Sequence, residues 1–102
     1  MALKITFTDA QGKVTKEYTA VALKMGIVDK LMEIGEKQAL NEIGKPSIKD
    51  QKEILFEMRA LLVEAFGDQF TYDELNKGAS IREVMNCFSS LNDFVMEAAV
   101  KN

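Results

Sequence analysis

The segment from Ser47 to Gly67 constrains the fold most strongly, because it contains a helix start signal, an apolar face and a stop signal. Ser47 followed by Asp50 resembles a capping box with aspartate in place of the usual glutamate, and Pro46 stops any helix arriving from upstream. Gly67 tolerates the left-handed conformation that commonly ends a helix. The pattern predicts the core helix of a small domain. Its apolar face comprises Ile54, Leu55, Met58, Leu61, Leu62, Ala65 and Phe66.

Three apolar residues lie on the opposite side of this predicted helix. On a helical wheel with about 100° per residue, Phe56 and Val63 fall nearly opposite the core stripe, and Ala60 lies between them. Two interpretations are open: the helix is sandwiched between other elements of the same chain, or this face contacts another molecule. Phe56, Ala60 and Val63 are therefore the candidate partner-binding residues.

The N-terminal residues have the two-residue period of β-strands. The alternating residues 3–8 predict a first strand, residues 9–12 predict a turn at Gly12, and residues 13–19 predict a second strand. A two-stranded hairpin is marginal in water, so its apolar face should pack on helices or on strands of another molecule. We expect that face to comprise Leu3, Ile5, Phe7, Val14 and Tyr18.

After Thr19 the pattern changes to a helical period, with Thr19 as the expected N-cap of the next helix. This helix either ends near Gly35 or runs irregularly to Ile43, because glycine weakens a helix interior. Residues 36–46 are expected to be a frayed helical end and a linker. The expected buried face of this helix comprises Leu23, Ile27, Val28, Leu31 and Ile34.

Two further helices carry start signals in the C-terminal third of the chain. Thr71 with Glu74 predicts a capping box for a short helix that ends at Gly78. Ser80 with Glu83 predicts another for a long final helix, and its expected apolar face runs from Ile81 and Met85 to Ala98 and Ala99. The chain of 102 residues is thus expected to be a single α+β domain, in which a hairpin (residues 1–19) packs on three to four helices (residues 20–102).

Composition argues against several classes of partner. The 13 basic residues are scattered and 16 acidic residues outnumber them, so a phosphate-binding surface for nucleic acid is not expected. No apolar run approaches the roughly 20 residues that span a bilayer, and no signal peptide is recognisable. The one cysteine, Cys87, agrees with a reducing compartment. We expect a soluble intracellular protein without a membrane partner.

The sequence offers no convincing catalytic constellation. Histidine is absent, which removes the commonest general base and metal ligand. The carboxylates of Glu53, Glu57 and Glu64 lie on one polar helix edge, and a solvated edge does not provide the apolar or like-charged setting that acid-base catalysis by paired carboxylates requires. Cys87 has no histidine to activate it and is interpreted as a packed side chain. We therefore expect no catalytic residue, no metal, no cofactor and no small-molecule substrate, and hence a protein that is not an enzyme.

The order of elements resembles the small tail assembly chaperones of long-tailed (siphovirus-type) phages of Gram-positive bacteria. The similar pieces are the hairpin KITFTDAQGKV, the segment LLVEAFGDQFTYDELNKG and the final amphipathic helix, and the most telling is Phe66 to Thr71 leading into Asp73-Glu74-Leu75. The resemblance implies a non-catalytic protein of the host cytoplasm, absent from the mature virion. It also implies binding to the tape measure protein, which it keeps soluble, and recruitment of tail tube protein subunits.

Spare apolar surface is consistent with this role and with self-association through the hairpin edges or the back of the central helix. The methionines of the helices suit either core filling or binding of loosely defined partners. The alternative function is a virion structural protein, such as a head-tail connector or a tail component. A small regulatory or adaptor domain is a third interpretation.

Overall fold

The computed structural model describes residues 3–20, 23–44 and 47–101, and begins with the predicted hairpin. Strand β1 (Leu3–Thr8) pairs in antiparallel fashion with strand β2 (Val14–Ala20). In the turn between them Gly12 has φ +81°, which glycine adopts without strain, and its N–H donates to the Asp9 carbonyl (3.0 Å). The Asp9 carboxylate also accepts from the N–H groups of Gln11 and Lys13. Local hydrogen bonds thus hold the predicted turn.

The hairpin register contains an irregularity that changes one expected core residue. Ile5 lies opposite Tyr18 and Phe7 opposite Lys16, but the register then shifts, so that Thr8 lies opposite Val14. The extra residue of a β-bulge bends the strand and breaks the strict alternation of side chains. Val14 was expected on the buried face, and this was wrong: its side chain is 60% exposed, whereas Leu3, Ile5 and Phe7 are buried.

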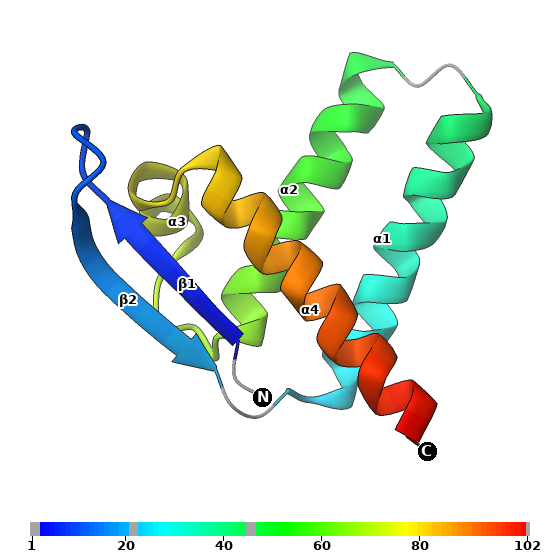
Figure 1. The fold of residues 1–102 in the computed structure, drawn as a ribbon. Helices are drawn as coiled ribbons and strands as arrows, with labels where there is room; N and C mark the ends of the chain where they lie inside the picture. Colours follow the sequence, from blue (N-terminus) through cyan, green and yellow to red (C-terminus); the bar gives the residue numbers. More distant parts are fainter. Residues whose placement is uncertain (1–2, 21–22, 45–46, 102) are drawn as a thin grey trace.

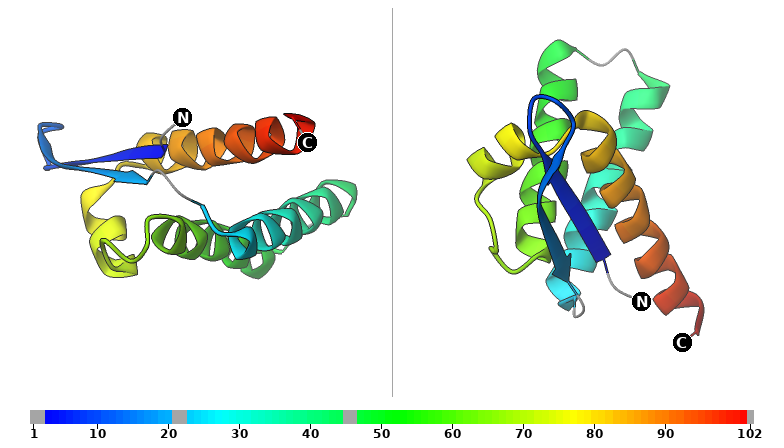
Figure 2. Two further views of the ribbon diagram at one scale, coloured as in Figure 1. Left: turned by 90° about the horizontal axis from the view of Figure 1, so that it is seen from below. Right: turned by 60° about the vertical axis from the view of Figure 1, so that its left-hand side comes forward.

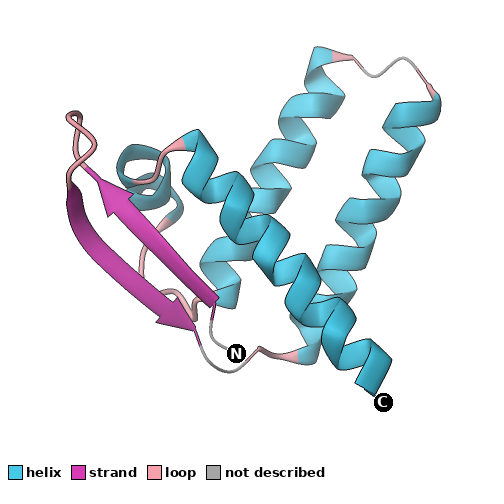
Figure 3. Cartoon of the chain, in the orientation of Figure 1, coloured by secondary structure: helices cyan, strands magenta, loops and turns pink. Residues whose placement is uncertain are grey.

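Four helices follow the hairpin and confirm the α+β fold class (Figures 1 and 3). Their bounds are α1 (Met25–Ile43), α2 (Ile48–Ala65), α3 (Tyr72–Gly78) and α4 (Ile81–Lys101). Helix α2 begins with the predicted capping box, in which the Ser47 hydroxyl accepts from the Asp50 N–H and the Asp50 carboxylate accepts from the Ser47 N–H. The box at Thr71 and Glu74 is also formed. Gly67 just after α2 has φ +65°, as its position predicted.

Helix α1 differs from the expectation at its start, whereas its end agrees with one of the two alternatives. Thr19 belongs to strand β2 and does not cap the helix, which starts at Met25 after Lys24 without a side-chain cap. The helix continues through Gly35 to Ile43, as the second alternative predicted, so residues 36–43 are helical. The reason is tertiary, because α1 lies alongside α2 along this length and the packing outweighs the cost of the glycines (Figure 1).

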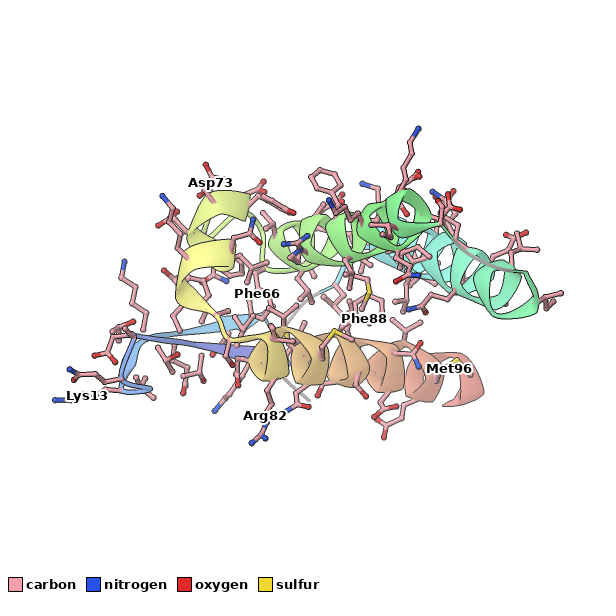
Figure 4. The ribbon with its side chains drawn as sticks, turned by 90° about the horizontal axis from the view of Figure 1, so that it is seen from above. Lys13, Phe66, Asp73, Arg82, Phe88 and Met96 are labelled. Carbon is pink, nitrogen blue, oxygen red and sulfur yellow. The ribbon has the colours of Figure 1, made fainter. Side chains whose placement is uncertain are left out.

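The elements form two layers. Viewed from below, the hairpin and α4 lie in one layer, and α1, α2 and α3 lie in the other (Figure 2). The molecule is accordingly flat, with extents of 39 × 38 × 18 Å. Phe66 from the end of α2 and Phe88 from α4 lie between the layers (Figure 4). The core therefore occupies the space where α2 crosses beneath β1 and α4.

An aromatic cluster joins the hairpin to the loop after α2. Phe70 lies 5.2 Å from Phe7, 4.9 Å from Tyr18 and 5.4 Å from Phe66, measured between ring centroids. Phe7, Phe66 and Phe70 are each at most 5% exposed. Tilted and edge-to-face aromatic pairs at these distances add to the stabilisation from burial. The cluster thus fixes how the hairpin sits on the helices.

Helix α4 also covers the outer edge of strand β1. The Thr6 N–H donates to Oε1 of Glu83 (2.9 Å), and the Glu83 N–H donates to the Ser80 hydroxyl (3.1 Å). Glu83 was expected to complete a capping box with Ser80. Only the bond to the Ser80 hydroxyl is formed, because the Glu83 carboxylate accepts from strand β1 instead. On the other strand, the Gln69 side-chain amide donates to the Thr19 carbonyl (2.9 Å). The hairpin edges were expected to be unpaired, but some of their backbone hydrogen-bonding groups thus have partners within the chain.

Candidate functional site: an apolar groove between helices α2, α3 and α4

The three expected partner-binding residues have different environments. Phe56 is 52% exposed, and its ring lies 5.0 Å from that of Tyr72 at the start of α3. Ala60 is half-buried and lines a shallow hollow between α1 and α2. Val63 is half-buried and packs against the core. Of the two interpretations left open, the intramolecular contact applies to Val63. About half of Phe56 remains exposed and is accessible to another molecule.

An apolar groove lies next to Phe56, where α2, α3 and α4 meet. Its volume is about 250 Å³. Buried Met58 and Leu75 form its floor, and Leu55, Ile81 and Met85 contribute side chains that are 46%, 85% and 43% exposed. The full lining comprises Leu55, Met58, Arg59, Leu75, Asn76, Ala79, Ile81, Val84 and Met85.

The groove exists because α3 is too short to cover its neighbours. Helix α3 has seven residues, whereas α2 has 18 and α4 has 21, so the apolar faces of the two longer helices extend beyond it. Leu55 was expected in the core stripe, and this was wrong, because almost half of it is exposed. Ile81 and Met85 were expected on the apolar face of the last helix but not at a site. Only eight residues separate the helix start signals at Thr71 and Ser80, and this spacing could have indicated that the helix between them is too short to cover its neighbours.

Arg59 is the charged residue of the groove lining. Its Nε donates to the Leu55 carbonyl (3.0 Å), and its NH1 donates to Oδ1 of Asn76 (2.8 Å). The guanidinium carbon lies 5.2 Å from the centre of the Tyr72 ring, within cation–π distance. These partners are all uncharged, so they orient the guanidinium without neutralising its positive charge. The planar fork of arginine suits a carboxylate that approaches from a ligand.

The three glutamates of α2 are held in ion pairs on the side that faces α1. Nζ of Lys37 lies 2.6 Å from the Glu57 carboxylate and 3.5 Å from that of Glu53, and Lys30 pairs with Glu64. The hydrogen bond to Glu57 is the main cause that raises the pKa of Lys37 above its usual value. These carboxylates connect two helices at an exposed surface. In the part of the chain that the structure describes, no group of three or more His, Cys, Asp or Glu residues is placed to hold a metal ion.

The methionines divide between the core and the surface. Met58 is 2% exposed, as core filling predicts, whereas Met25, Met32 and Met96 are 74%, 68% and 56% exposed. Figure 4 shows Met96 near the C-terminal end of α4, far from the groove. Met85 contributes a flexible, polarizable side chain to the groove itself. Core filling therefore does not explain most of the methionines among the described residues.

Cys87 is expected to resist alkylation in the folded protein. It is 3% exposed, and burial, with a smaller contribution from the charge of Glu83, raises the pKa of its thiol to about 12. A rise of about three pKa units lowers the thiolate fraction at pH 8 roughly 1,000-fold, and the thiolate is the reactive form. Alkylation by iodoacetamide, followed by mass spectrometry, should be at least ~100-fold slower in native buffer than in 6 M guanidinium, a denaturing concentration. Equal rates would contradict this placement of Cys87.

A comparison with known protein families gives a match over nearly the whole chain. The family model described as "Phage tail chaperone protein" matches residues 1–101. No curated protein and no solved structure matches the chain. None of the helices in the described ranges is both long enough and apolar enough to cross a membrane. Because the family match covers essentially the whole sequence, the chain belongs to the phage tail chaperone protein family.

Proposed function

We propose that this chain is a non-catalytic tail assembly chaperone that binds the tape measure protein, keeps it soluble in the cytoplasm of the host bacterium and recruits tail tube subunits. The phage is of the siphovirus type and its host is Gram-positive, as the resemblance of the hairpin and of residues 66–75 implies. Family membership supports the chaperone role in its general form. The observation that carries the proposal is the uncovered apolar surface formed by the groove and by Phe56.

The chemistry of this surface fits a client rather than a substrate. A chaperone must hold apolar segments of its client reversibly, which requires apolar area that its own fold leaves uncovered. The groove supplies such area, with Arg59 and Asn76 as its polar lining residues.

Phe56 is the member of the expected trio that serves the client most directly. It is half-exposed, and its ring lies against Tyr72, the same ring that the Arg59 guanidinium approaches, so it adds apolar surface close to the groove. Ala60 is half-buried and lines the hollow between α1 and α2 instead. Val63 contributes mainly to the core and supports the helix that presents Phe56.

Phe56→Asp is expected to leave the chaperone folded and to reduce the amount of soluble tape measure protein. Surface substitutions usually change the free energy of unfolding by less than about 0.5 kcal/mol, although loss of the contact with Tyr72 raises this to about 1 kcal/mol. A charge in the apolar contact should at least halve the soluble fraction of the co-expressed tape measure protein. Gel densitometry of soluble and total protein measures that fraction.

Met32→Asp is the matched control, because Met32 is an exposed apolar residue of α1 that does not line the groove. It introduces the same charge and should leave client solubility unchanged. Equal losses in both variants would assign the effect to net charge and reject Phe56 as a contact. Val63→Asp should instead lower the melting temperature, because its side chain packs against the core.

The location of the protein after assembly separates a chaperone from a structural component. We expect mass spectrometry of purified phage particles to detect the tape measure and tail tube proteins but not this chain. Stoichiometric recovery of the chain from the particles would favour a virion structural protein. Self-association belongs to the same proposal and can be measured by sedimentation, with the outer face of α2 and the β2 edge as the expected contacts.

A further inference from the structure

We infer that the groove between α2, α3 and α4 receives an amphipathic helix of the client, whose apolar side chains fill the groove and whose carboxylate pairs with Arg59. This inference rests on the proposed function and specifies the chemistry of the bound segment. It joins three observations: the secondary structure of the groove walls, the apolar character of the lining, and the uncompensated charge of Arg59.

The walls of the groove offer no edge with which an extended strand could pair. All nine lining residues belong to α2, α3, α4 or the short link between α3 and α4. Backbone groups inside a helix are already hydrogen-bonded, so these walls offer no ladder of donors and acceptors to an added strand. The nearest strand, β1, has its outer edge engaged by Glu83. A segment entering this apolar space must satisfy its own backbone, as a helix does.

The charge of the groove selects an acidic residue on that helix. Among the described residues, every ion pair with a nitrogen-to-oxygen distance of up to 3.9 Å joins a lysine to a glutamate. None of these pairs involves Arg59. Leu55, Tyr72 and Asn76 hold the guanidinium at the groove without balancing its charge. No acidic residue lines the groove, so a ligand carboxylate meets attraction there and no like charge in the lining.

The expected ligand pattern follows from helix geometry. Apolar anchors at positions i, i+3 or i+4, and i+7 place two or three side chains on one face, which can enter the hollow beside Leu55 and Met85. An aspartate or glutamate at the edge of that face then reaches Arg59. A second copy of this chain is the competing occupant, and a solution experiment separates the two.

The test uses the full chaperone with overlapping 25-residue peptides that tile the tape measure protein of the same phage. Binding is measured by fluorescence anisotropy, and helix formation on binding by circular dichroism. We expect the binding peptides to be amphipathic, acidic and helical when bound. Arg59→Glu should weaken them by about 10- to 100-fold, the usual range for losing a charge-assisted hydrogen bond. Replacing the peptide carboxylate with lysine should restore binding to that variant.

Arg82→Glu is the matched control, because Arg82 is the other arginine of the chain and lies on the far side of α4 from α2 (Figure 4). It makes the same change in net charge and should leave peptide binding within about twofold. Arg59→Lys keeps a positive charge and tests whether a loss in Arg59→Glu reflects charge rather than damaged folding. Equal weakening by Arg59→Glu and Arg82→Glu would overturn the inference.

The remaining outcomes distinguish this inference from the proposed function. If the chaperone solubilises the full-length tape measure protein but no peptide binds in an Arg59-dependent manner, the inference fails and the proposed function stands. If neither the protein nor any peptide binds, both fail. If Arg59→Glu instead dissociates an oligomer of the chaperone in sedimentation experiments, a second copy occupies the groove and the inference is overturned.

Discussion

Phe70→Ala is expected to lower the free energy of unfolding by about 3–5 kcal/mol, the range for removing a buried aromatic side chain. Phe70 is 2% exposed, and its ring centroid lies within 5.4 Å of the centroids of Phe7, Tyr18 and Phe66. The substitution leaves a cavity where the hairpin meets the end of α2. For a domain of about 100 residues, such a loss lowers the melting temperature by at least about 10 °C. Thermal and urea denaturation, followed by circular dichroism, measure both quantities.

Phe56→Ala is the control for this prediction. It removes the same number of atoms from a side chain that is 52% exposed, so it should cost no more than about 1 kcal/mol. Phe70→Leu, which keeps apolar volume but loses the ring, should fall between the two. A loss at Phe70 no larger than that at Phe56 would show that the aromatic cluster does not anchor the hairpin.

Gly78→Ala is expected to destabilise the fold by about 1–3 kcal/mol, although alanine is the better helix former. A Cβ atom at position 78 would lie 2.5 Å from Cδ2 of Phe7 and 3.0 Å from its Cγ. That ring is buried and lies 5.0 Å from Tyr18 and 5.2 Å from Phe70, so it has little freedom to move away. The last residue of α3 must therefore be small for the hairpin to approach.

Gly35→Ala is the matched substitution with the opposite expected sign. Gly35 lies inside α1, and a Cβ there would have no heavy atom within 4 Å. The change should stabilise the protein by about 0.5–1 kcal/mol, because it improves helix propensity without a steric cost. Urea denaturation of both variants decides the matter. If Gly78→Ala also stabilised the protein, the Phe7 ring would have to move aside at little cost, and the expected steric conflict would be contradicted.

Features that depend on residues close together in the sequence were predicted correctly. The capping boxes at Ser47 and Thr71 depend on residues three positions apart, and each formed as predicted. The turn at Gly12 and the end of α2 at Gly67 depend on single residues that adopt positive φ. The α+β fold class followed from these signals, because the change from a two-residue to a helical period marks the boundary between hairpin and helices.

The errors occurred where a distant partner decides the outcome. Thr19 has the chemistry of an N-cap, but strand pairing with Lys4 keeps it in β2. Glu83 lies at the spacing of a capping box, yet its carboxylate accepts from the Thr6 N–H, 77 residues away. Leu55 fits the core stripe of α2, but it stays 46% exposed because α3 ends after seven residues. None of these partners is visible within a sequence window.

The sequence by itself determined that α2 has an apolar core face and a second apolar side, because both follow from the positions of its residues on one helical wheel. The tertiary structure decided how that second side is used. Val63 packs against the core, while Phe56 stays half-exposed next to the groove. The groove depends on the relative lengths and positions of α2, α3 and α4, and on Arg59 being held by Asn76. Periodicity states which side of a helix is apolar, but packing between distant elements determines which part of that side remains uncovered.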